Sequence, residues 1–238
     1  MNIEEVKNRI KERGYWKINF HPIKFIPDLI PSRNDCREIL TNNIVRLTGW
    51  DYPHIPSHND DKQAIYAGED YYEAYIDWDI YKEVWRFYQS GQFIHYRALK
   101  EDWMQESIWG YNNIKPCSIL EINMTNYTLT EVFEFLRRLT IGSKVYEDGV
   151  KIDVELLNTG GRKLEILEPN RAPLMRQYVA RIPEIKIPEK TVTKEDIINK
   201  SRELALESLA YVFETFRWTN QPTEVFKSDQ QKLLERRF

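Results

Sequence analysis

Apolar and polar side chains alternate along residues 71–96, and this alternation indicates antiparallel β-strands. The run YYEAYIDWDIYKEVWRFYQSGQFIHY carries large apolar residues at short, regular spacing, with charged residues between them. Aromatic and β-branched residues in such a pattern are typical of a pleated sheet with one buried face. Turns are expected at Asp79-Ile80 and at Ser90-Gly91, so the pattern predicts a three-stranded meander over residues 71–99.

The first hairpin of this meander has a register that its charges support. A turn centred on Asp79-Ile80 sets Asp77 opposite Lys82 and Glu73 opposite Arg86. Opposite charges directly across antiparallel strands contribute about 0.2–1 kcal/mol each. Two such pairs on one face favour this register, because a slip by one residue would move every side chain to the other face.

The second hairpin is predicted with an even-numbered loop centred on Ser90-Gly91. This register pairs Phe87 with Ile94 and Arg86 with His95. The inner face of the meander is then predicted to hold Tyr72, Ala74, Ile76, Trp78, Tyr81, Trp85, Phe87, Ile94 and Tyr96. The outer face is predicted to hold Tyr71, Tyr75, Arg86, Tyr88, Phe93, His95 and Arg97.

Six residues of the predicted outer face form a candidate binding surface: Tyr75, Arg86, Tyr88, Phe93, His95 and Arg97. Aromatic rings interleaved with bases on an exposed sheet are typical of surfaces that stack single-stranded nucleic acid, and the same surface suits a protein partner. Glu73 and Asp77 offset part of the positive charge. The alternative is a helix that covers this face, and the layered packing of α+β domains favours it.

Glu83 is the one acidic residue predicted on the inner face, opposite Ile76. A position near the end of the sheet would let its carboxylate reach water or a basic partner, which is the favoured interpretation. The alternative is a buried carboxylate held in an aromatic pocket with a raised pKa, which would make Glu83 a candidate functional group.

Helices and further strands are predicted around the meander. Apolar spacing and capping residues predict four helices. They are expected at 3–13, at 32–40 with Ser32 as the cap, from Thr128 with Glu131 as a capping box, and at 193–217, where Thr193 with Asp196 starts the helix. Additional strands are predicted at 15–25, 44–50, 150–157 and 162–167, the last two as a hairpin.

These elements predict an α+β fold: an antiparallel sheet with the aromatic meander packed by helices, plus a C-terminal helical arm. Prolines at 169, 173, 183 and 188 indicate an extended connector. We therefore expect an α+β domain over 1–168, a proline-rich connector over 169–192, and a C-terminal helix and frayed tail over 193–238. The C-terminal helix is the expected contact for a protein partner or for a second copy of the chain.

The composition and charge of the chain exclude several kinds of binding site. The 238 residues carry a formal net charge of −3, so only a local basic patch would bind nucleic acid. Two cysteines, far apart, exclude a zinc site made of cysteines and favour reduced thiols in a cytoplasmic protein. No segment approaches the roughly 20 apolar residues that span a bilayer, so no membrane association is expected.

One proline-rich loop gathers candidate metal ligands: Asp51, His54, His58 and Asp60. Imidazole and carboxylate suit zinc or manganese, so a metal-dependent hydrolase is an alternative function. The prolines at 53 and 56 forbid a regular helix, so the two imidazoles need not converge. No complete catalytic or phosphate-binding motif occurs elsewhere, and the sequence favours a protein that is not an enzyme and needs no cofactor.

Four stretches of the sequence resemble a known family: Tyr15-Trp16-Lys17, GWDYPH at 49–54, WRFYQSGQF at 85–93 and TEVFEF at 130–135. Together they are similar to an uncharacterised bacterial domain that follows Schlafen-like, AlbA-type domains assigned to DNA binding, over about residues 14–167. That family has no assigned active residues, so none is transferred. This chain shows no counterpart of the DNA-binding half. The resemblance implies a standalone sensing or partner-binding module of a bacterial multi-component system, such as phage defence.

The leading hypothesis from the sequence is therefore a non-catalytic interaction or sensor module that contacts a protein partner. Binding of single-stranded nucleic acid through the outer face is the second hypothesis. A metal-dependent hydrolase centred on His54 and His58 is the third.

Overall fold

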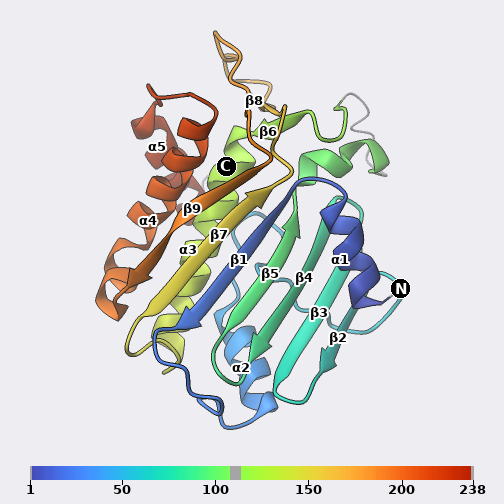
Figure 1. Ribbon diagram of the computed structural model, residues 1–238, viewed down its shortest axis with the longest axis vertical. Coiled ribbons are helices and arrows are strands. Elements are labelled where there is room, and N and C mark those ends of the chain that lie inside the picture. Colours follow the sequence, from blue (N-terminus) through green and yellow to red (C-terminus); the bar gives the residue numbers. More distant parts are fainter. Residues whose placement is uncertain (1, 108–113, 237–238) are drawn as a thin grey trace.

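The computed structural model describes residues 2–107 and 114–236, and its centre is one seven-stranded antiparallel sheet (Figure 1). The strand order is β2-β3-β4-β5-β1-β7-β9, so β1 inserts between β5 and β7. The strands are β1 (Tyr15–Pro22), β2 (Gln63–Ala67), β3 (Tyr71–Trp78), β4 (Tyr81–Tyr88), β5 (Phe93–Ala98), β7 (Val150–Leu157) and β9 (Glu184–Val192). A separate parallel pair joins β6 (Ile119–Glu121) and β8 (Lys163–Glu165).

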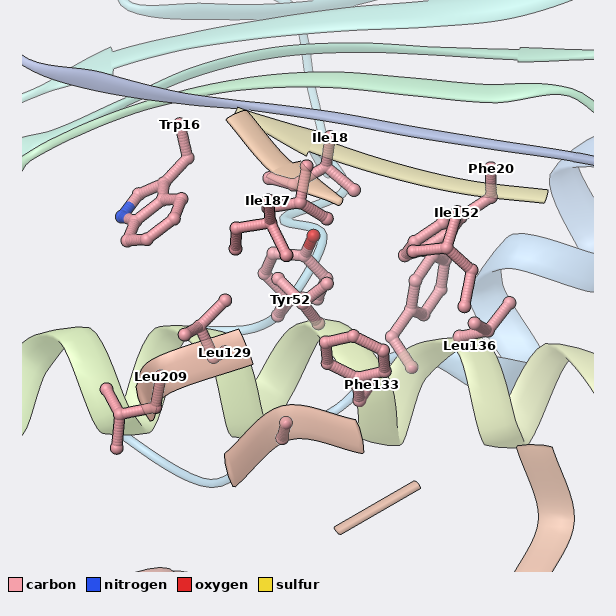
Figure 2. Packing of buried hydrophobic residues seen from close by; sticks show 14 of the residues in the cluster. Trp16, Ile18, Phe20, Tyr52, Leu129, Phe133, Leu136, Ile152, Ile187 and Leu209 are labelled. Carbon is pink, nitrogen blue, oxygen red and sulfur yellow. The ribbon is translucent and has the colours of Figure 1, made fainter. Parts of the chain in front are cut away.

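Helices cover the two faces of the sheet unequally. They are α1 (Ile3–Lys11), α2 (Arg33–Asn43), the 3-10 helix η1 (Lys100–Glu106), α3 (Ile122–Gly142), α4 (Lys194–Thr215) and α5 (Thr223–Glu235). α3 runs along one face, called here the inner face, and α4 packs against α3 as a further layer (Figure 2). α1 lies over β3, β4 and β5 on the opposite, outer face (Figure 1). Within the described part of the chain, no helix has the length and apolar character needed to cross a bilayer.

The main hydrophobic core lies between the sheet and α3 (Figure 2). Ile18 of β1 and Ile152 of β7 point towards Leu129 and Phe133 of α3, with Leu209 of α4 beyond them. All five side chains are buried, and burial of each contributes about 1.5–3 kcal/mol. The predicted α+β fold, with its aromatic meander packed by helices, is confirmed.

The predicted register of the first hairpin is also confirmed. β3 and β4 pair Asp77 with Lys82 and Glu73 with Arg86. Lys82 Nζ lies 2.5 Å from Asp77 Oδ1, and Arg86 Nη2 lies 2.5 Å from Glu73 Oε2. The charges across these strands therefore indicated the register correctly. Trp78 keeps its predicted pairing with Tyr81, but its side chain remains exposed at the end of β3.

The predicted register of the second hairpin is wrong by one residue. β4 and β5 pair Phe87 with Phe93. The amide of Tyr88 donates to the carbonyl of Gln92, so the loop between them contains three residues rather than an even number. Its last residue, Gly91, has a φ of +83°. A turn that ends in a left-handed glycine is a common three-residue hairpin loop, and it shifts the register by one.

This shift reverses the faces assigned to β5. Ile94 and Tyr96 lie on the outer face, whereas the side chains of Phe93, His95 and Arg97 lie on the inner face and are buried. Three of the six residues of the candidate binding surface are therefore enclosed between the sheet and the inner-face elements.

We expect Gly91→Ala to lower the free energy of unfolding by at least about 1–2 kcal/mol, the usual cost of a left-handed conformation for an L-residue. The added Cβ would also lie 2.4 Å from Val145 Cγ1. Gly160→Ala is the matched control, since its Cβ would meet no atom closer than 3.6 Å. Urea unfolding measures the difference, and equal stability of the two variants would contradict this loop geometry.

The predicted connector and helical arm are wrong, because the C-terminal third belongs to the same core. β9 pairs with β7 in the main sheet, and α4 packs against α3. Leu209 and Phe213 of α4 are buried, so much of its apolar face is occupied within the chain. The expected frayed tail is instead α5, where Phe226 packs against Phe213 and Trp218.

Some predicted helix ends are confirmed and one is wrong. Ser32 caps α2 and Thr193 caps α4, as predicted. α3 begins at Ile122 rather than near Thr128, because the carboxylate of Glu121 accepts an amide of the first turn and caps the helix earlier.

Two strand predictions are also wrong. Residues 44–50 contribute a single bridge, between Val45 and Tyr52, rather than a strand. β8 pairs in parallel with β6 instead of forming a hairpin with β7. The 44–54 segment is consequently a loop, and it packs against the inner face.

The two edges of the sheet carry different local features. Beside β2, the side-chain oxygen of Asn59 accepts the backbone N–H of Ile65 at 2.9 Å, and its amide nitrogen donates to the Ile65 carbonyl at 3.4 Å. Within β9, Pro188 has no N–H to donate. Each edge therefore presents an incomplete row of backbone hydrogen-bonding groups.

Candidate functional site

A cavity of about 1090 Å³ lies where β5 ends and α3 begins. Most of its lining is apolar and includes Leu47, Leu99 and Met104. The walls come from segments far apart in the sequence: residues 16, 46–51, 80–81, 97–104, 114, 121–131, 167–169 and 236. A cavity of this size and apolar character is typical of sites for small organic molecules.

Lys100 supplies this cavity with an amine. It begins η1, directly beyond β5, and its half-buried side chain places Nζ 4.5 Å from the centre of the Tyr81 ring. Burial, followed by the positive charge of Arg97, lowers the pKa of Lys100 to about 8. Within residues 2–107 and 114–236, no carboxylate lies within ion-pair distance of this nitrogen. Lys100 is thus a cation held at an apolar wall without a fixed counter-ion.

Two carboxyl groups of the lining have pKa values above the ordinary value for glutamate. Burial raises the pKa of Glu101 to about 7, and burial likewise raises the pKa of Glu121. Glu101 Oε1 accepts the backbone amide of Glu121 at 3.0 Å. A carboxyl group that is half-protonated near pH 7 can both give and take a proton within the cavity.

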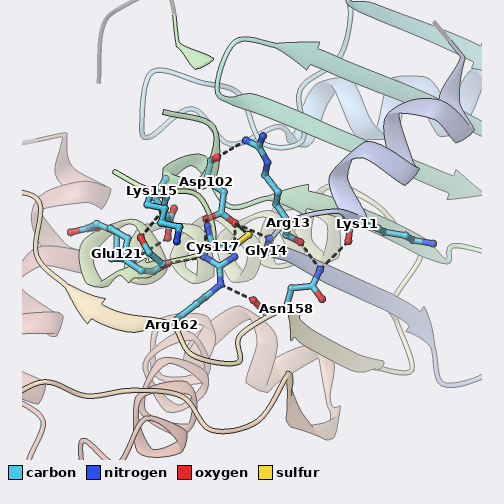
Figure 3. Close-up of polar contacts among 12 residues, drawn as sticks. Lys11, Arg13, Gly14, Asp102, Lys115, Cys117, Glu121, Asn158 and Arg162 are labelled. Carbon is cyan, nitrogen blue, oxygen red and sulfur yellow. Dashed lines mark hydrogen bonds and ion pairs between the residues drawn. The ribbon is translucent and has the colours of Figure 1, made fainter. Parts of the chain in front are cut away.

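A buried ion pair holds η1 in place (Figure 3). Arg162 Nη2 lies 2.5 Å from Asp102 Oδ2, and Arg162 Nη1 lies 2.8 Å from Asp102 Oδ1. Asp102 also accepts the backbone amides of Gly14 and Cys117, at 2.7 and 2.8 Å. A Cβ at Gly14 would lie 2.3 Å from the guanidinium, so this approach requires glycine. The segment that carries Lys100 is therefore tied to the start of β1 and to the β6–β8 region.

A second buried ion pair joins β5 to α3 at the wall of the cavity. Arg97 Nη1 lies 3.0 Å from Glu131 Oε2, and Thr48 donates its hydroxyl to Glu131 Oε1 at 2.8 Å. The Arg97 guanidinium also lies 5.1 Å from the centre of the Tyr52 ring. The 44–54 loop is thereby connected to both β5 and α3 through polar groups.

Glu83 lies in a buried cluster deeper in the same face. Glu83 Oε2 lies 2.8 Å from His95 Nε2, Trp50 Nε1 donates to Glu83 Oε1 at 2.9 Å, and His95 Nδ1 lies 3.1 Å from the Tyr52 hydroxyl. Burial raises the pKa of Glu83, but contact with His95, then Arg97 and Trp50, outweighs it and leaves that pKa lowered. Burial lowers the pKa of His95. Contact with Glu83 acts on the pKa of His95 in the opposite direction, and burial is the larger effect.

Each interpretation of Glu83 is correct in part. The side chain does not reach water, because it is only 2% exposed, but it does meet a basic partner, since its Oε2 lies 2.8 Å from His95 Nε2. It does lie among aromatic groups, yet its pKa is lowered instead of raised, since His95 and Trp50 stabilise the ionised form. Its register partner on β5 is Arg97.

Asn123 adds a buried polar group without a partner. The side chain lines the cavity and is only 4% exposed. Its Nδ2 has no hydrogen-bond partner among the described residues. Buried amide nitrogens are almost always satisfied in native proteins, so such a group calls for an explanation, for example a bound molecule or water.

The remaining residues of the predicted outer surface are largely engaged. Tyr75 is 1% exposed and packs with Val6 and Ile10 of α1, so the alternative of a helix covering this face is confirmed. Arg86 pairs with Glu73 and donates to the Tyr88 hydroxyl at 3.1 Å. Arg86 and Tyr88 are half-buried, and they are the only two of the six that are neither buried nor enclosed in the described structure.

The predicted metal ligands do not converge. The His54 ring stacks on Trp50 with centroids 4.2 Å apart, while Asp51 pairs with Arg46. His58 contacts Asp60 at 2.9 Å in an exposed part of the loop. Among the described residues, no group of three or more histidine, cysteine, aspartate or glutamate side chains is arranged to hold a metal ion.

Sequence reasoning missed the residues that define the cavity. Lys100, Glu101 and Asn123 belong to no motif, and they meet only because β5, η1 and α3 converge. One indication was present: with a three-residue loop at Gly91, Glu83, His95 and Arg97 share the inner face. Three ionisable residues on a buried face would have pointed to an internal polar site.

Comparisons with family models, curated proteins and solved structures found no match to this chain. The resemblance to the domain that follows Schlafen-like, AlbA-type domains therefore stays a prediction. What the site can do is inferred from its own geometry.

Proposed function

We propose that this protein is a non-catalytic sensor module that binds a small organic molecule in the cavity between β5, η1 and α3. The cavity itself carries the proposal, because its volume of about 1090 Å³ and its apolar lining suit a metabolite-sized ligand. Most of the lining surface is apolar, and the polar and charged side chains among it are the groups that fix the orientation of a ligand in sites of this kind.

The unpaired polar groups of the cavity define the ligand's chemistry. Lys100 Nζ and Asn123 Nδ2 are donors without acceptors among the described residues. Glu131 is already paired with Arg97, and Glu168 with Arg171. The ligand is therefore expected to combine an apolar body with a hydrogen-bond-accepting group, such as a carbonyl or carboxylate oxygen.

The 44–54 loop is the proposed route from ligand to partner. Thr48 lines the cavity and bonds to Glu131, while the Trp50 ring stacks on Tyr81 with centroids 4.1 Å apart. A ligand that displaced either contact would move a loop whose neighbouring residues 57–62 are exposed. The proposed setting is cytoplasmic, in a bacterial multi-component system such as phage defence, and the resemblance of residues 14–167 supports it.

Thermal and urea unfolding in the presence of a library of small carboxylic acids, ketones and aldehydes tests this function. A compound present at 100 times its dissociation constant is expected to stabilise the fold by about 2.7 kcal/mol. Thr128→Trp places a large ring in the cavity and is expected to abolish that gain. Thr41→Trp, on the exposed side of α2, is the control and should retain it.

Two results would refute the sensor proposal. The first is a library in which no compound stabilises the parent protein. The second is stabilisation of equal size in the parent and in Thr128→Trp, because the compound would then bind elsewhere.

A further inference from the structure

We propose that Lys100 captures its ligand covalently, by forming an imine between Nζ and the carbonyl carbon of an aldehyde or ketone held in the cavity. This inference rests on the proposed ligand-binding function and narrows the ligand to carbonyl compounds. It assigns a chemical role to one nitrogen atom.

The surroundings of Lys100 differ from those of Lys82, which is buried, and of Lys17, which is half-buried. Lys82 Nζ lies 2.5 Å from Asp77, and Lys17 Nζ lies 2.8 Å from Glu155. Each of these ammonium groups lies within ion-pair distance of a carboxylate, although burial still lowers the pKa of Lys82. Lys100 has no such partner within the described chain, and its Nζ lies 4.5 Å from the centre of the Tyr81 ring. Its nitrogen therefore faces the cavity without an ion pair that would have to break before reaction.

Two physical effects make this nitrogen nucleophilic. Desolvation disfavours the ammonium form, and the neighbouring Arg97 guanidinium adds like-charge repulsion. Together they lower the pKa of Lys100 to about 8. About one Lys100 side chain in ten is then unprotonated at pH 7, against fewer than about one in a thousand for an ordinary lysine. Apolar surroundings and an adjacent cation are the usual means of activating an amine nucleophile.

The reaction is balanced without any further reagent. The unprotonated amine attacks the carbonyl carbon, and the new C–N bond forms as the carbonyl oxygen takes a proton to give a carbinolamine. The nitrogen then loses its second proton and the hydroxyl leaves as water, which produces the C=N bond. Glu101, in the same cavity and with a pKa of about 7, is placed to supply the proton that the departing hydroxyl needs.

Benzaldehyde with sodium cyanoborohydride is the probe, because cyanoborohydride reduces an imine to a stable secondary amine. Peptide mass spectrometry then reports the rate of benzylation at each lysine. At pH 7 we expect Lys100 to react at least tenfold faster than the median of the other lysines, with a rate that levels off above about pH 8. Benzoate, of the same size but unable to form an imine, should slow the labelling by competition.

Variants separate this chemistry from general exposure. Lys163→Arg, which removes a different lysine, should leave the fast labelling intact, and Lys100→Arg should eliminate it while preserving the positive charge. Thr128→Trp should slow labelling of Lys100 at least fivefold by filling the cavity. Labelling of Lys100 at or below the median rate of the other lysines overturns the inference. If benzoate still binds in that case, Lys100 only attracts anionic ligands through its positive charge and forms no imine. The library screen decides the ligand-binding function independently of either result.

Discussion

Arg162→Met is expected to lower the free energy of unfolding by about 3–5 kcal/mol, the usual cost of leaving one partner of a buried ion pair alone. Arg162 is fully buried and Asp102 is 1% exposed, so water cannot take the place of the lost partner. The guanidinium also donates to the carbonyls of Asn158 and Ile119, at 2.7 and 2.8 Å. Three separate segments therefore lose hydrogen bonds at once, and urea unfolding measures the loss.

A matched control distinguishes burial from charge. Lys227→Met removes a cation from an exposed pair with Glu224, at 2.8 Å on α5, and should change the stability by no more than about 0.5 kcal/mol. Asp102→Asn should be as damaging as Arg162→Met, and the double variant should cost less than the two single losses together, because the two groups interact directly. Additive losses would contradict a direct pair.

Glu101→Gln is expected to change the pH dependence of stability. The folded-state pKa of Glu101 is about 7, above its ordinary value of 4.5, because the carboxyl group is buried. The folded protein therefore holds this proton more tightly than the unfolded chain, and its contribution to stability is present below pH 4.5 and is lost as the pH rises through about 7. At 1.36 kcal/mol per unit, the loss is about 3 kcal/mol.

The glutamine variant lacks this titration but keeps an oxygen for the Glu121 amide. Relative to the parent, Glu101→Gln should thus become more stable by about 3 kcal/mol between pH 4.5 and 8, measured by urea unfolding at each pH. Glu106→Gln removes one acidic group from the exposed side of the same segment and serves as the control. A constant difference between parent and Glu101→Gln across this range would show that Glu101 ionises in the folded protein as it does in water.

The meander shows where sequence reasoning worked and where it failed. The first hairpin was predicted correctly because the pairs Asp77–Lys82 and Glu73–Arg86 each restrict the register. The second hairpin had no such pair, and its register depended on the loop length alone. Gly91 was visible in the sequence, but a glycine with positive φ closes two-residue and three-residue hairpin loops alike, so it does not by itself determine the loop length.

The helices illustrate a second limit. Ser32 and Thr193 were predicted as caps because a hydroxyl can accept a first-turn amide, and both do so. α3 is capped by Glu121, whose carboxylate also accepts the Leu167 amide from the β8 side of the molecule. A cap whose second partner comes from a distant segment has no local sequence pattern.

The cavity was beyond prediction for a related reason. Its charged groups are ordinary surface residue types, and what distinguishes Lys100 and Glu101 is burial after η1 folds beside α3. The sequence also did not indicate that β9 and α4 belong to the main domain. Pro188 was interpreted as part of a connector, but it lies in an edge strand, where a proline is tolerated. Both outcomes are tertiary effects that override local preference.

Asn59 gives the sheet a property beyond its own stability. An open seven-stranded sheet ends in two rows of backbone groups, and such rows invite another chain to add a strand. The side chain of Asn59 forms hydrogen bonds with both the N–H and the carbonyl of Ile65 at the β2 edge. At the opposite edge, Pro188 of β9 has no N–H to donate. The protein thus discourages edge-to-edge aggregation at the level of single residues, and Asn59 protects against misassembly as well as satisfying a loop.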